Sequence, residues 1–169
     1  SLEKSGYEVT YLPVDKYGMV NLDDIKKATK TTTTMVSIIY ASGEIGTIEP
    51  IKEIGAFTKE KGILFHSDAV AATGNIPIDV RDVHLDALSM SANQFYGPAG
   101  IGALYVREGV RILPFLEGGV QENGRRAGTE NIIGIVGMGK AAELARSEMT
   151  QRMDKVQTLR NQLRDGIRK

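Results

Sequence analysis

The stretch "TMVSIIYASGEIGTIEPIKEIGAFTKEKGILFHSDA", residues 34–69, contains two apolar β-rich runs separated by one amphipathic segment. The runs 34–41 and 63–69 lack polar alternation, which is typical of strands buried on both faces. Between them, 49–62 places its apolar residues on one helical stripe, with Gly62 as the expected C-cap. A strand, a helix and a strand in this order favour a parallel strand pair.

The same alternation continues on both sides of this stretch. Asn21 is expected to cap a short helix, and Thr129 a long helical segment that runs to the end of the chain. Together the elements predict an α/β fold with a mostly parallel sheet flanked by helices. Further strands are expected at 7–14, 85–92 and 100–106, with 76–80 either a short strand or an extended link.

The composition is that of an ordinary globular domain. Acidic and basic residues balance at 21 each, which gives no electrostatic basis for binding nucleic acid or an anionic membrane. No apolar run approaches the ~20 residues of a membrane span, and the N-terminal sequence does not resemble a signal peptide, so a cytoplasmic location is expected. Both ends lie in helical patterns, and we expect the chain to be a piece of a longer protein.

Three polar clusters directly follow predicted strands. They are "YASGEIG" (40–46), "HSDAVAATG" (66–74) and "SMSANQFYG" (89–97). Ligands of open α/β sheets gather at the carboxyl ends of the strands. The sequence therefore predicts one shared site at this edge of the sheet.

Two of these polar residues allow more than one interpretation. Asp68 is either a turn or helix-capping carboxylate, which is common at such junctions, or a group that holds a cationic ring nitrogen or a metal. His66 shares a face with Asp68 by alternation, and is either half of a metal pair or a hydrogen-bonded core histidine, the second being the more frequent case. His84 is expected at the surface. With two histidines and no cysteine, no metal site is expected.

A glycine-rich loop at 118–131 contains Arg125 and Arg126 and precedes the long helical segment. A glycine loop that leads into a helix N-terminus can bind an anion, because free N–H groups and the helix dipole point the same way. Phosphate or carboxylate binding and a purely structural role remain equally open. The loop matches neither the dinucleotide nor the NTP-binding pattern.

Long collinear stretches of the chain resemble the cysteine desulfurases, in the class V group of fold-type I pyridoxal 5'-phosphate (PLP) enzymes. The resemblance implies the central-to-C-terminal part of a PLP-dependent transferase large domain at 1–145. It also implies that 146–169 is part of a long helix leading toward a small domain. The resembling stretches are "GYEVTYLPVDKYGMVNLDDI", "EIGTIEPIKEIG", "ILFHSDAVAATGNIPIDV", "DALSMSANQFYGPAGIGALYV" and "GGVQENGRRAGTENIIGIVGMGKAAELA".

The resemblance implies a set of cofactor-binding residues. Asp68 matches the aspartate that pairs with the pyridinium nitrogen and keeps it protonated. Ser91 matches a serine that binds the cofactor phosphate, and Asn93 lies beside it in the same cluster. Thr129 matches a threonine that reaches the phosphate of the neighbouring subunit, which implies a homodimer.

Other positions depart from the family pattern. Gln94 occupies the position of the Schiff-base lysine, and a neutral amide cannot form an imine with PLP. Ala71 replaces a glutamine that contacts the ring, and Ser42 and Gly43 replace a pair of asparagines. Ala99 stands where relatives often carry lysine. With no cysteine in the chain either, we expect 1–169 to be inactive alone, and no catalytic residue is assigned.

For the whole protein the resemblance implies sulfur mobilisation from L-cysteine, giving alanine and an enzyme persulfide, for iron–sulfur clusters or other sulfur transfer. An iron–sulfur scaffold or a sulfur-acceptor protein is then a possible partner. Two alternatives stay open. One is a non-catalytic scaffold that partners an active desulfurase, and the other is a different class V activity of the transaminase type.

Overall fold

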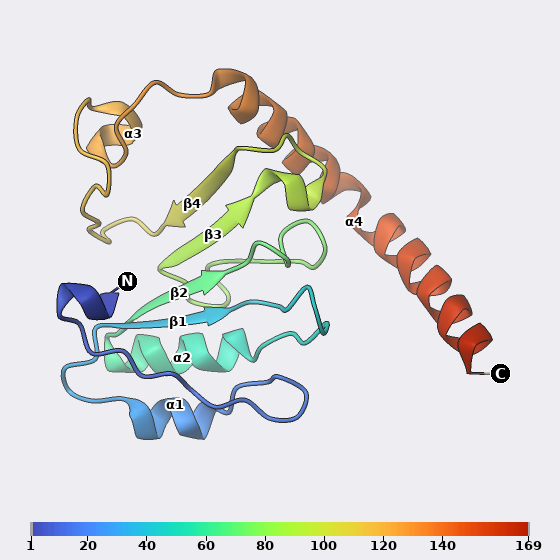
Figure 1. The fold of residues 1–169 in the computed structure, drawn as a ribbon, viewed down its shortest axis with the longest axis horizontal. Helices are drawn as coiled ribbons and strands as arrows, with labels where there is room; N and C mark the ends of the chain where they lie inside the picture. The colour runs from blue at the N-terminus through green and yellow to red at the C-terminus, as the bar shows by residue number, and fades with distance from the viewer. Residues whose placement is uncertain (1, 169) are drawn as a thin grey trace.

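A computed structural model describes residues 2–168, which form one four-stranded sheet in the order β1-β2-β3-β4 (Figure 1). The first three strands are parallel, and β4 is antiparallel to β3. An α/β fold with a mostly parallel sheet is therefore confirmed. The strands are β1 (Met35–Ile39), β2 (Leu64–Asp68), β3 (Ala87–Ser91) and β4 (Gly102–Val106). The helices are η1 (Leu2–Ser5), α1 (Leu22–Ala28), α2 (Ile51–Lys61), η2 (Ala92–Phe95), α3 (Gln121–Gly124) and α4 (Ile132–Ile167).

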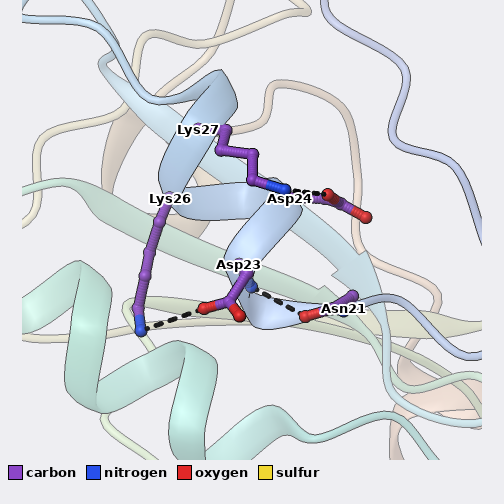
Figure 2. Close-up of polar contacts among 5 residues, drawn as sticks. All are labelled: Asn21, Asp23, Asp24, Lys26 and Lys27. Carbon is purple, nitrogen blue, oxygen red and sulfur yellow. Dashed lines mark hydrogen bonds and ion pairs between the residues drawn. The ribbon is translucent and has the colours of Figure 1, made fainter.

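Helix α1 begins at the cap that the sequence predicts (Figure 2). The Asn21 side-chain oxygen accepts a hydrogen bond of 2.9 Å from the Asp23 backbone N–H. Two ion pairs follow along the helix surface, Asp23 with Lys26 and Asp24 with Lys27. Because these pairs are exposed, each adds only about 0.2–0.5 kcal/mol, and the cap is the stronger local signal.

Helix α2 approaches the segment between β2 and β3 so closely that only glycine fits at the contact. A Cβ on Gly55 would lie 2.0 Å from the Val83 carbonyl oxygen. Ile54 and Phe65 are fully buried at this interface. The helix ends at Gly62 with a left-handed φ of 68°, which confirms the predicted C-cap.

The two faces of the sheet differ. One face carries Phe65 and Leu88 into the core. The opposite face, called the open face below, exposes Met35, Ile39, Leu64 and Leu104. The prediction that β1 and β2 are buried on both faces is wrong for the described residues, since Met35, Ile39 and Leu64 stay 46%, 43% and 39% exposed.

One further prediction needs correction, and one open alternative is decided. Residues 7–14 form no ladder, and only Val14 makes an isolated bridge, with Val20. A strand needs a hydrogen-bonded neighbour. This segment has none, because a groove of about 420 Å³ separates it from β1. Residues 76–80 are an extended link, which was one of the two alternatives.

Helix α4 begins later than expected, at Ile132, because Asn131 and not Thr129 caps it. The Asn131 side chain accepts a bond of 3.0 Å from the Gly134 N–H. Its first half packs on η2, burying Ala141 and Ala145. The second half extends well beyond the sheet (Figure 1). Among residues 2–168, no helix combines the length and apolarity that crossing a bilayer requires.

Candidate functional site at the strand ends

Asp68 and Ser91 lie at the carboxyl ends of the neighbouring parallel strands β2 and β3. The strand register pairs Asp68 with Ser89. Ser91 follows Ser89 by two residues, and residues two apart on a strand share a face. Both side chains therefore lie on the open face, at the edge of the sheet that the sequence predicts.

The Asp68 carboxylate is exposed and locally bonded. Its Oδ1 accepts a hydrogen bond of 3.0 Å from the Val70 N–H, which stabilises the turn after β2. None of the salt bridges of the described residues involves Asp68. The carboxylate thus forms the turn that the sequence allowed, and it retains acceptor capacity for a cationic group.

Ser91 and Asn93 are bonded to each other. The Ser91 hydroxyl donates to Asn93 Oδ1 at 2.6 Å. Gln94 follows on η2 with an exposed side chain. The segment ends at Tyr96, which takes a left-handed φ of 66°. This cluster therefore offers a hydroxyl and two neutral amides, which can bind a polar ligand but cannot act as a base or an amine nucleophile.

The strand ends contain no amine. The sequence has no lysine between Lys61 and Lys140, so the segments that follow β2 and β3 cannot supply one. Lys140 lies on α4, where its Nζ bonds Glu143 at 2.8 Å and both side chains are largely exposed. A carboxylate and a hydroxyl fit non-covalent binding of a phosphorylated pyridine, whereas a covalent bond to an aldehyde has no partner here.

The other departures from the family pattern lie close together. A Cβ on Gly43 would lie 3.4 Å from the Ala71 Cβ, so the loop after β1 contacts the turn after β2. The Ser42 hydroxyl oxygen accepts long hydrogen bonds from the Glu44 and Ile45 N–H groups. Small side chains therefore border the edge beside Asp68. Ala99 is exposed in the turn that follows η2.

His66 is a hydrogen-bonded histidine rather than half of a metal pair. Its two ring nitrogens bond Ser37 and Ser89, each at 2.8 Å. Burial lowers the pKa of His66, and the Asp68 carboxylate opposes part of that change. Ser37 and Ser89 were not predicted as partners of His66, because alternation along one strand does not fix its register against the next strand. His84, expected at the surface, is half-buried with a φ of 53°.

Thr129 does not join Asp68 and Ser91 within one chain. It is exposed in the segment between α3 and α4, which Figure 1 shows beyond β4. No hydrogen bond of the described residues links it to the strand ends. In the same loop, Arg126 Nη1 donates to the Ala127 carbonyl at 2.9 Å, and Gly128 N–H donates to Gln121 Oε1 at 3.2 Å. The loop thus holds its own shape, and its contact with a second subunit stays a prediction.

Comparison with known proteins gives a consistent result. The aminotransferase class-V family model matches residues 1–169. Cysteine desulfurase IscS of Clostridium botulinum (strain Hall) is 56% identical over 166 residues, which are 98% of this chain and 42% of the relative. Cysteine desulfurase IscS of Methanosarcina thermophila is 55% identical over 168 residues, 99% of this chain and 42% of the relative.

Solved structures agree on the backbone. A NifS-like protein superposes with a TM-score of 0.94 at 40% identity, covering 98% of this chain and 46% of its own. A structure of SspA in complex with cysteine gives a TM-score of 0.81 at 40% identity, covering 84% of this chain and 42% of its own. The chain therefore spans less than half the length of the relatives that it matches.

Proposed function

Because the chain belongs to the aminotransferase class-V family, we propose that the protein containing it is a cysteine desulfurase-like protein that mobilises sulfur from L-cysteine. The observation that carries this proposal is the high identity with relatives named cysteine desulfurase over nearly the whole chain. A homodimer, a cytoplasmic location and a scaffold or sulfur-acceptor partner are parts of the same proposal.

The family is PLP-dependent, and the bound cofactor supplies an electron-withdrawing pyridinium ring. In our proposal Asp68 binds the ring nitrogen and keeps it protonated, because a carboxylate stabilises the cationic form. Ser91 turns its hydroxyl from Asn93 toward the phosphate, and Asn93 then keeps a free amide for the same ligand. Thr129 serves the site of a second subunit.

Binding in this chain is proposed to be non-covalent. Gln94 carries no amine, and the segments after β2 and β3 contain no lysine. The chain also has no cysteine to accept sulfur. We therefore expect residues 1–169 to bind PLP without releasing sulfide from L-cysteine.

A second candidate function is that of a non-catalytic partner of an active desulfurase. The observation that favours it is the clustering of small or neutral residues at the strand ends, Gln94, Ala71, Ser42 and Gly43, two of which, Ala71 and Gly43, contact each other. A site that had only lost its lysine would not require the neighbouring positions to change as well.

The test is gain of a covalent bond. PLP is added to the wild-type chain and to Gln94→Lys, the mixtures are reduced with borohydride, and intact mass is measured. Gln94→Lys should gain one pyridoxyl adduct that maps to position 94, whereas wild type should gain none there. Gln151→Lys, an exposed position on α4, is the matched control for nonspecific lysine labelling. Equal labelling of positions 94 and 151 would contradict a PLP site at the strand ends.

Function is then read from sulfide and alanine release. The wild-type chain is incubated with L-cysteine and PLP, and both products are quantified. Sulfide from the chain alone would contradict the proposed dependence on an absent lysine and cysteine. If the chain instead raises turnover by an added active desulfurase without any of its own, the non-catalytic partner is the better description.

A further inference from the structure

A row of three polar side chains crosses the open face of the sheet. Ser37 of β1, His66 of β2 and Ser89 of β3 are joined by two hydrogen bonds of 2.8 Å, one to each ring nitrogen. Three other neighbours on this face, Met35, Leu64 and Leu104, are apolar and exposed. The row therefore ties three strands together where the surrounding side chains cannot.

This row lies two residues before Asp68 and Ser91 along their strands. His66 precedes Asp68 by two residues on β2, and Ser89 precedes Ser91 by two on β3. Residues two apart on a strand point the same way and lie about 7 Å apart. The row is thus the nearest polar contact between the strands beneath the candidate ligands.

The row suits a neutral histidine. A neutral imidazole has one N–H donor and one acceptor nitrogen, and serine hydroxyls can satisfy both. Burial lowers the pKa of His66, while the Asp68 carboxylate raises it by a smaller amount. Asp68 is the one titratable group that the described strands place on this face beside His66. The facing residues of β1 and β3, Ser37, Ser89 and Ser91, and the β4 residues opposite them are uncharged.

We propose that His66, held as a neutral ring between Ser37 and Ser89, is a positioning residue that fixes the ends of β1, β2 and β3 beneath Asp68 and Ser91. The inference rests on the proposed PLP site. A neutral ring leaves the Asp68 carboxylate free for the cationic pyridine nitrogen. A protonated ring places a positive charge about 7 Å from the Asp68 carboxylate, where it competes with the pyridine nitrogen. At an effective dielectric constant of about 40, this charge weakens PLP binding about five- to tenfold.

The test measures PLP affinity by calorimetry between about pH 8 and about pH 5, where histidine changes charge. Three variants are compared with wild type. His66→Gln keeps a neutral donor and acceptor, His66→Phe keeps neither, and His84→Asn removes the other histidine with a residue that tolerates its left-handed φ. The same PLP is used with all four proteins, so the difference between wild type and His66→Gln reports the effect of the His66 charge.

We expect His66→Gln to match wild type within about twofold at about pH 8 and to lose about five- to tenfold less affinity at about pH 5. His66→Phe should bind more weakly at every pH, and His84→Asn should follow wild type. Identical pH profiles for wild type and His66→Gln would overturn the proposal. So would wild-type affinity in His66→Phe.

A second readout separates this inference from the proposed function. If wild type binds no PLP at any pH, the cofactor proposal fails and the row is tested by NMR alone. The His66 ring should then show a single neutral tautomer, and amide exchange at 68–70 and 89–92 should accelerate in His66→Phe and return to the wild-type rate in His66→Gln. Unchanged exchange in His66→Phe would refute the positioning role.

Discussion

Gly74 lies in the segment after β2 and packs against the turn that carries Gln94. Its φ is +80°, and an added Cβ would lie 2.5 Å from the Phe95 Cβ and 3.5 Å from the Ala145 Cβ. Phe95 is nearly fully buried. Because the clash is with a Cβ and not with the end of a flexible chain, η2 has to move to relieve it. Gly74→Ala should therefore displace η2, which carries Gln94, as well as lower the free energy of unfolding.

The expected loss has two parts. Forcing alanine into a left-handed conformation costs about 1–2 kcal/mol. Overpacking of a buried contact costs about 1–3 kcal/mol. The free energy of unfolding of Gly74→Ala should thus fall by about 2–5 kcal/mol, a large part of the total stability of a single domain.

Two glycines of the same chain separate these parts. Gly100 has a φ of +79° with no atom within 4 Å of its added Cβ, and Gly139 on α4 has open space and no positive φ. The free energy of unfolding of Gly100→Ala should fall only by the conformational cost, about 1–2 kcal/mol. That of Gly139→Ala should rise by about 0.5–1 kcal/mol, because alanine is favoured within a helix.

The assay is urea unfolding followed by circular dichroism, with amide exchange at 92–97 as a local readout. Of these variants, Gly74→Ala should unfold at the lowest urea concentration, and it should be the one variant that accelerates amide exchange at 92–97. If Gly74→Ala proved no less stable than Gly100→Ala, the close packing of η2 against this segment would be refuted.

Three further predictions concern other parts of the molecule. Asn21→Ala removes the α1 cap and should lower the free energy of unfolding by about 1 kcal/mol, whereas Asn21→Ser should restore most of it; equal stability of all three proteins in urea would argue against the cap. Ile54→Ala empties a fully buried position and should cost about 2–5 kcal/mol, with Ile54→Val costing far less; a loss below 1 kcal/mol for alanine would mean that the α2 interface is looser than described. Burial lowers the folded-state pKa of His66 below its ordinary 6.5, so the unfolded chain takes up this proton first as the pH falls. Stability present above about pH 6.5 should therefore be lost below it, and His66→Gln should show a shallower loss; parallel curves for the two proteins would count against a neutral His66.

The sequence predicted two helix caps and the order of elements at 34–69 correctly. The strand–helix–strand order of 34–69, the Asn21 cap and the Gly62 C-cap were all predicted and found. Each depends on residues within about one helical turn of one another, where side-chain pattern and backbone preference act directly. The resemblance to cysteine desulfurases was equally readable, because it rests on long collinear stretches and not on contacts.

Long-range pairing could not be read in the same way. Residues 7–14 have strand composition but form no hydrogen-bonded ladder with a described strand. Asn131 and not Thr129 caps α4, although both residue types are common N-caps. The serine partners of His66 were missed because a hydrogen bond between strands depends on register, which one strand's sequence does not contain.

The amino-acid sequence by itself determined most of the helices and strands, with 7–14 as the exception, and it determined that no amine or thiol stands in the segments after β2 and β3. Only the tertiary structure decided that β4 runs antiparallel, that Asp68, Ser89 and Ser91 share one face, and that His66 bridges two serines. The physical reason is range: propensity and capping act between near neighbours in the chain, whereas strand register is selected by packing of the whole sheet.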